Sequence, residues 1–108
     1  GIIENMAYFT PEELPDNKYY IFGKDGAKNL AEDIDTAFLG EIPLVQSIRE
    51  AGDVGHPVAL QEGTILEKSF NDIIKEMVSQ LLKRNANLPP TEVVRITTMS
   101  GCSAVKKK

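Results

Sequence analysis

The chain has 108 residues, of which 42% are hydrophobic and 26% charged, and this length suits one small domain rather than two. The balance excludes wholesale disorder, and no apolar run approaches the roughly 20 residues that a membrane-spanning helix needs. Residues 1–72 carry five basic and fourteen acidic side chains, whereas residues 73–108 carry seven and two, so an acidic surface dominates and argues against a nucleic-acid partner.

The start of the chain and its single cysteine bear on where the protein works. Residues 1–4 lack the basic stretch and long apolar run of a secretory signal, and they are typical of a strand from a larger protein. Cys102 is the one cysteine, so it forms no internal disulfide and cannot make a metal site alone. These two properties of the cysteine favour a reducing, cytoplasmic location.

Two short strands are predicted before residue 23. Residues 1–6 contain an Ile-Ile pair and predict a buried strand, and residues 19–22 predict a second, aromatic one. Between them, the prolines and acids of residues 10–18 predict a surface loop.

A helix and a further strand follow. Asp25 is expected to cap the helix, and the apolar run of residues 37–42, closed by Pro43, predicts the strand. The order strand, helix, strand is typical of a parallel crossover unit. The apolar face of this helix would contain Ala27, Leu30, Ala31 and Ile34.

The second half of the chain predicts mainly helix. Residues 46–51 can form one or two turns that stop at Gly52. Thr64 and Glu67 have the spacing of a capping box, so we predict a helix over residues 65–84. Its apolar stripe would contain Leu66, Phe70, Ile73, Ile74, Met77 and Leu81.

The C-terminal residues predict less structure. The Pro-Pro pair at residues 89–90 ends helical structure, residues 92–97 suit either an edge strand or a loose tail, and the last eight residues are expected to be disordered. We therefore expect an α/β fold of short parallel strands covered by helices in residues 1–88, followed by a flexible tail over residues 89–108.

Four spaced strings point to a family. GIIENMAYF at residues 1–9, YIFG at 20–23, FLGEIPL at 38–44, and IREAGD at 48–53 followed by Gly55 and Pro57, closely resemble the Mrp/ApbC family. These are P-loop ATPases related to MinD and nitrogenase iron protein that act as iron–sulfur cluster carriers. The resemblance covers residues 1 to about 84. It implies the C-terminal part of a parallel-sheet ATPase domain whose phosphate-binding motif lies earlier in the chain.

The resemblance also implies ligands and partners. The complete protein would bind ATP and Mg²⁺, form a homodimer and serve iron–sulfur client proteins, with no nucleic acid or membrane partner. Asn5 would contact the adenine ring through its amide, and Pro43 and Leu44 would flank the same base. Without such a role, Asn5 makes a turn, and Pro43 and Leu44 serve turn and core packing. Arg49 and Asp53 either form a structural ion pair or act near phosphate.

Two departures limit what this chain can do alone. It contains no G-x-x-x-x-G-K-[ST] motif, and the nearest glycine turn, residues 23–26, includes Asp25, which would repel phosphate. Many relatives carry C-P-x-C between the positions of Phe9 and Tyr20, where two thiolates per subunit bind a bridging [4Fe-4S] cluster. Residues 10–18 have no cysteine, so we expect no cluster on this chain and no ATP hydrolysis by it alone.

Two alternatives to an iron–sulfur ATPase stay open. A MinD/ParA-like positioning ATPase shares the scaffold and would be indicated by an amphipathic membrane-binding helix or by DNA binding. A free-standing, non-catalytic interaction module would need no nucleotide.

Overall fold

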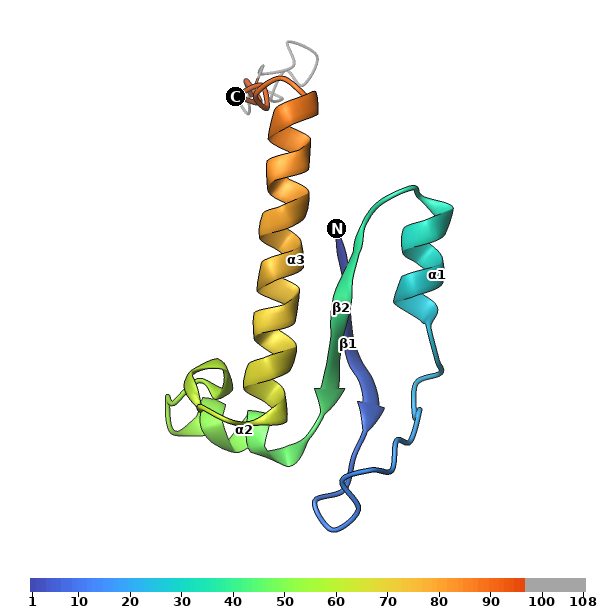
Figure 1. Ribbon diagram of the computed structural model, residues 1–108, viewed down its shortest axis with the longest axis vertical. Helices are drawn as coiled ribbons and strands as arrows, with labels where there is room; N and C mark the ends of the chain where they lie inside the picture. Colours follow the sequence, from blue (N-terminus) through green and yellow to red (C-terminus); the bar gives the residue numbers. More distant parts are fainter. Residues whose placement is uncertain (97–108) are drawn as a thin grey trace, which may run out of the picture.

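The computed structural model describes residues 1–96 and shows an α/β arrangement (Figure 1). Its elements in chain order are β1 (Ile2–Phe9), α1 (Gly26–Asp33), β2 (Phe38–Leu44), α2 (Gln46–Asp53), a 3-10 turn (Val58–Leu60) and α3 (Ile65–Asn87). The predicted fold class is confirmed. The expectations for Cys102 and for the last eight residues lie outside the described part of the chain.

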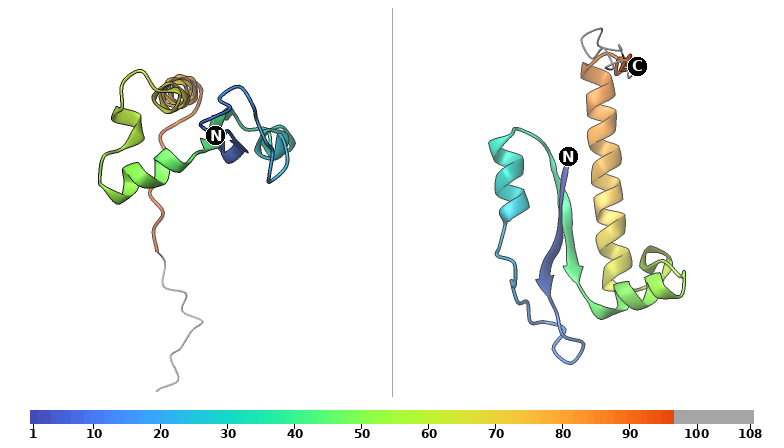
Figure 2. Two further views of the ribbon diagram at one scale, coloured as in Figure 1. Left: turned by 90° about the horizontal axis from the view of Figure 1, so that it is seen from below. Right: turned by 180° about the vertical axis from the view of Figure 1, so that it is seen from behind.

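The two strands run parallel, as the predicted crossover requires. Ile3 pairs with Gly40, and the regular ladder runs to the pair Asn5 and Ile42, after which the register shifts before Phe9 meets Leu44. Helix α3 lies on one side of the strands and α1 on the other (Figures 1 and 2). The sheet is therefore covered on both faces, as parallel sheets usually are.

Thr64 caps α3 as predicted, and Glu67 bonds back to Gly63, one residue before the N-cap residue of a standard capping box. The Glu67 backbone N–H donates to Thr64 Oγ1 at 3.0 Å, and the Glu67 carboxylate accepts from the Gly63 backbone N–H at 2.7 Å. Both bonds satisfy donors at a helix start that would otherwise lack partners. The helix ends at Asn87, three residues beyond the prediction, because Leu88 is extended, as is common for a residue that precedes proline.

The apolar stripe of α3 is buried over only part of its length. Leu66 and Ile73 are buried, whereas Ile74, Met77 and Leu81 are about half exposed. A two-stranded sheet has a narrow face, so the C-terminal half of α3 has less of the sheet to pack against than the N-terminal half. The main buried cluster lies at the other end of the helix and contains Ala51, Val58 and Leu66, against which Val45, Ile48 and Phe70 pack.

Three local predictions are corrected. Asp25 occupies the cap position of α1, but its side chain makes no capping bond, and of the predicted apolar face only Ala31 is buried. Residues 19–22 are not a strand, because Tyr19 alone bridges β1 and the chain then turns. Gly52 does not stop α2, which continues to Asp53.

Candidate functional site

The carboxyl ends of β1 and β2 open onto a cleft of about 710 Å³. One wall comes from the segment after β1 and the other from the first residues of α2 and α3. Buried Pro43 lies between them at the end of β2. The apolar lining includes Tyr8, Phe9, Pro11, Pro15, Val45 and Leu66, and the polar lining includes Lys18, Gln46, Ser47, Gln61 and Thr64. Such an apolar cleft with a few polar groups, at this end of a parallel sheet, is the usual place for a small ligand.

Asn5 lies where the regular strand pairing ends. Its side chain is exposed, and its Oδ1 accepts a hydrogen bond from the Met6 backbone N–H at 2.9 Å. Met6 has a left-handed φ of 54°, so the strand bends directly after Asn5. This bond fixes the orientation of the Asn5 side-chain amide, and its Nδ2 group can still donate hydrogen bonds to another partner.

Asn5, Pro43 and Leu44, the residues expected around a base, are near one another in the sheet but differ in their position relative to the cleft. Asn5 pairs with Ile42, the residue before Pro43, and partly buried Leu44 pairs with Phe9. Pro43 lines the cleft, whereas Asn5 and Leu44 do not. The sheet register therefore brings the three positions to the same strand ends, with Pro43 alone in the cleft wall.

Arg49 and Asp53 form an ion pair one turn apart on α2, with 2.5 Å between Nη1 and Oδ2. Arg49 Nη2 also lies 3.7 Å from a Glu50 carboxylate oxygen. About two thirds of each side chain in the Arg49–Asp53 pair is exposed. Neither residue lines the cleft, so the pair belongs to the outer surface of α2.

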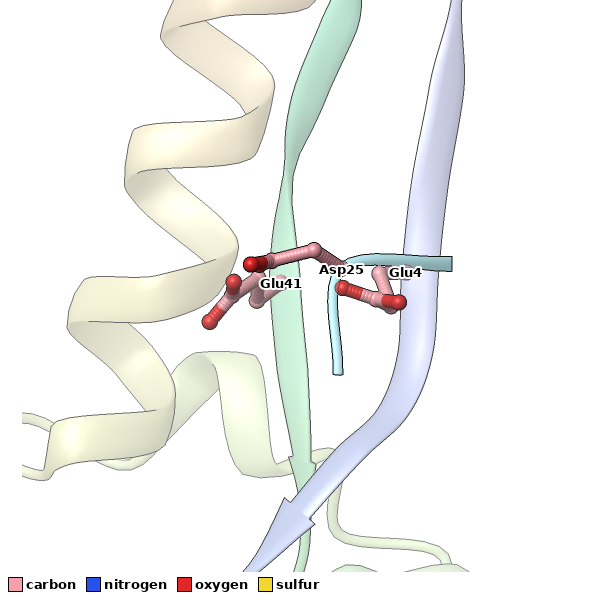
Figure 3. Close-up of side chains that lie close together, drawn as sticks. All are labelled: Glu4, Asp25 and Glu41. Atoms are coloured by element: carbon pink, nitrogen blue, oxygen red, sulfur yellow. The ribbon is translucent and has the colours of Figure 1, made fainter. Parts of the chain in front are cut away.

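A cluster of three carboxylates lies over the sheet, and the sequence alone did not reveal it (Figure 3). Glu4 and Glu41 face each other in the strand register, and Asp25 comes from the start of α1. One oxygen from each lies within 4.8 Å of the others. Oxygen ligands of this kind suit Mg²⁺ or Ca²⁺, but three partly exposed carboxylates do not by themselves define a metal site. The spacing in sequence hid the cluster, because Asp25 was expected to cap its own helix.

Glu4 supplies the capping bond that Asp25 does not. Its Oε1 accepts a hydrogen bond from the Ala27 backbone N–H at 3.1 Å, across 23 residues. The carboxylate thus satisfies a free donor in the first turn of α1 and ties that helix to the sheet.

A protein family and several known proteins match most of the chain. Residues 1–82 match the ParA family model described as NUBPL iron-transfer P-loop NTPase. The "Iron-sulfur cluster carrier protein" of Synechocystis is 35% identical over 82 residues, which are 75% of this chain and 23% of the relative. The "Iron-sulfur cluster transfer protein NUBPL" of Dictyostelium discoideum is 39% identical over 82 residues, or 75% and 25%.

A plant relative extends the similarity further. The "Iron-sulfur protein required for NADH dehydrogenase, mitochondrial" of Arabidopsis thaliana is 36% identical over 94 residues, which are 86% of this chain and 29% of the relative. The chain thus spans about a quarter of the length of these relatives. Because the family model covers more than half of the chain, the chain belongs to the ParA family, as a partial region related to the NUBPL iron-transfer P-loop NTPases.

Proposed function

We propose that this chain is the base-binding end of an ATP-dependent P-loop protein that takes part in iron–sulfur cluster assembly or transfer. The observation that carries the proposal is the family match over residues 1–82, together with a cleft at the strand ends that Pro43 lines. Asn5 pairs with Ile42, the residue before Pro43, and so lies at the same strand ends. The named functions of the relatives support the iron–sulfur role.

The chemistry of these residues suits adenine. With Oδ1 of Asn5 held by the Met6 N–H, Nδ2 can donate to a ring nitrogen while the second Oδ1 lone pair accepts from the adenine amino group. The Pro43 ring and the Leu44 side chain would give a flat base an apolar contact. Guanine presents an oxygen in place of that amino group, so it would leave the Asn5 acceptor without a partner.

The described residues do not fit the triphosphate. In the glycine turn of residues 23–26, the Gly23 N–H donates to the Tyr20 carbonyl, and the Asp25 carboxyl lies with two glutamates. A phosphate needs free N–H groups and a nearby cation instead. In our proposal, other parts of the complete protein bind the triphosphate, and ATP hydrolysis needs them.

The segment of residues 10–18 bears on the cluster. It forms one wall of the cleft through Pro11, Glu12, Glu13 and Pro15, and it contains no cysteine. Carboxylate oxygens are poor ligands for an iron–sulfur cluster compared with thiolates. We therefore propose that this protein serves cluster transfer without a cluster bound through this segment.

A titration of the chain with nucleosides tests the base site. We expect adenosine to shift the amide resonances of Asn5 and Leu44 with a dissociation constant of about 1 to 10 mM, because a base without its phosphates supplies little binding energy. Guanosine should bind several-fold more weakly, and Asn5→Ala should abolish the shifts while Asn17→Ala, a matched exposed asparagine, should not. Shifts centred on other residues, or equal binding of both nucleosides, would contradict the proposal.

The remaining parts of the proposal have their own readouts. The complete protein is expected to be a homodimer in a reducing compartment such as the cytoplasm, which sedimentation and cell fractionation measure. Anaerobic reconstitution with iron and sulfide should leave residues 10–18 without a cluster. A brown product whose colour depends on those residues would refute this step.

A further inference from the structure

An aromatic segment lies on the surface at a turn where polar residues are usual. The Gly23 N–H donates to the Tyr20 carbonyl at 3.3 Å, which closes a turn with Ile21 and Phe22 at its two central positions. Such positions ordinarily hold Gly, Pro, Asn, Asp or Ser. Here they hold two large apolar side chains that are 60% and 69% exposed, and Tyr19 and Tyr20 beside them are exposed as well.

This segment is held in place at both ends. Tyr19 exchanges two backbone hydrogen bonds with Phe9 of β1, at 2.8 and 2.9 Å. At the other end, the Ala27 N–H is bound to Glu4, also in β1. The Tyr8 and Tyr20 rings meet edge to face at 6.2 Å. A surface anchored in this way loses little conformational entropy when it binds.

The charges around the segment differ from those of the surrounding chain. Residues 1–72 are strongly acidic, and their five basic side chains are Lys18, Lys24, Lys28, Arg49 and Lys68. Arg49 and Lys68 form ion pairs with neighbouring aspartates. Within residues 1–96, neither Lys18 nor Lys24 forms an ion pair. Instead their ammonium groups lie over the Tyr8 and Tyr20 rings, at 4.3 and 5.2 Å.

We propose that residues 18–24 form a docking surface for a partner protein that presents an acidic, amphipathic segment. The Ile21 and Phe22 side chains would enter apolar contacts with the partner, and Lys18 and Lys24 would pair with its carboxylates. Aromatic side chains dominate the energy of protein contacts, and the flanking lysines select an acidic partner. Lys18 also lines the cleft at the strand ends, whereas Ile21, Phe22 and Lys24 do not.

Peptide binding to the 108-residue chain tests the docking surface. The probe is a synthetic helical peptide with Leu and Phe on one face and Glu on the other, compared with the same peptide carrying Lys in place of Glu. We expect the acidic peptide alone to shift the amides of residues 18–24. Its affinity should fall at least about tenfold in Phe22→Ser and in the double variant Lys18→Glu/Lys24→Glu. It should also fall severalfold between about 50 and about 300 mM salt.

Matched variants separate the surface from general stickiness. Leu82→Ser removes a similarly exposed apolar side chain, and Lys75→Glu reverses a cation elsewhere on α3, so both should bind the acidic peptide normally. Phe22 is exposed, so Phe22→Ser should melt like the parent chain. Equal binding of both peptides, or equal loss in the control variants, would overturn the proposal.

Two other occupants give different results. A second copy of the chain would appear in sedimentation as a dimer that Phe22→Ser dissociates, with no response to the acidic peptide. A lipid surface would appear as binding to phosphatidylserine vesicles through residues 18–24, again with no response to the peptide. Either result would overturn the acidic-partner proposal.

Discussion

The Glu4 carboxylate in β1 and the Ala27 backbone N–H in α1 form a hydrogen bond of 3.1 Å that joins the sheet to the start of the helix. The same carboxylate faces Glu41 across the strands and lies within 4.8 Å of Asp25. Glu4 therefore stabilises the start of α1 through a hydrogen bond, while repulsion from two nearby carboxylates opposes this. The net effect on the free energy of unfolding can be measured.

Replacing Glu4 should separate these two effects. Glu4→Ala removes the acceptor at the start of α1 and should lower the free energy of unfolding by about 0.5 to 2 kcal/mol, the usual range for loss of a helix cap. Glu4→Gln keeps an oxygen acceptor and removes one charge, so it should stay within about 0.5 kcal/mol of the parent chain. Urea unfolding measures both changes, and exchange of the Ala27 amide should accelerate only in Glu4→Ala. An equal loss in both variants would show that the charge, rather than the hydrogen bond, matters.

At Gly40, the contact between β2 and α3 leaves no room for a side chain. A Cβ at this position would lie 2.7 Å from Ile73 Cγ1, and the φ of 146° is one that other residues rarely adopt. Gly40→Ala should therefore cost about 1 to 3 kcal/mol of stability, through overpacking and backbone strain together.

Two variants check the Gly40 prediction. Gly52→Ala lies in α2 with nothing within 4 Å of the added Cβ, and it should be neutral or stabilise by up to about 1 kcal/mol. In a Gly40→Ala/Ile73→Ala chain the clash disappears, so the double variant should be more stable than the sum of the two single losses predicts. Strict additivity in thermal unfolding would contradict the steric account.

Local sequence rules predicted the elements whose partners lie close in the chain. Thr64 and Glu67 are three residues apart, so the start of α3 could be predicted. Pro43 was expected to close its strand, but it lies within β2, which runs to Leu44 and pairs there with Phe9. The cap of α1 could not be predicted, because Glu4 lies 23 residues before Ala27 and only the folded sheet brings them together. For the same reason the sequence did not reveal the carboxylate cluster or the cleft.

The site residues show the same limit. The family resemblance selected Asn5, Pro43 and Leu44, and the strand register places them at neighbouring positions. Pro43 alone lines the cleft, however, and β1 bends at Met6, where the regular register ends after Asn5. Such a bend depends on one left-handed residue that the strand pattern did not indicate.

The two ends of α3 should respond differently to truncation. Leu66 is buried against Ala51 and Val58, so Leu66→Ala should cost about 2 to 5 kcal/mol through lost burial and the cavity left behind. Leu82 is 65% exposed near the other end, and Leu82→Ala should change stability by less than about 0.5 kcal/mol. Urea unfolding of the two variants measures the difference. Similar losses would show that the distal half of α3 is buried against a second surface in solution.

Asp72 forms an ion pair with Lys68, one turn before it on α3. Lys68 Nζ donates to Asp72 Oδ2 at 2.6 Å, and this hydrogen bond, which stabilises the ionised carboxyl, holds the pKa of Asp72 below its ordinary value. The charge of Lys68 and that of Lys75 act in the same direction, and partial desolvation opposes them. We expect Lys68→Ala to raise the Asp72 pKa toward the ordinary aspartate value of about 3.9, as carboxyl NMR titration would show.

The sign of the effect on stability follows from that shift. Because the pKa is lower in the folded chain than in the unfolded one, the pair stabilises the fold above about pH 3.9, and this contribution is lost as the pH falls through the lowered pKa. The melting temperatures of the parent chain and Lys68→Ala should therefore differ near neutral pH and converge in acid. Lys83→Ala, a lysine on the same helix that has no contact with Asp72, should leave the Asp72 titration unchanged. If Lys83→Ala and Lys68→Ala raised the pKa equally, the general charge of the helix rather than this hydrogen bond would set it.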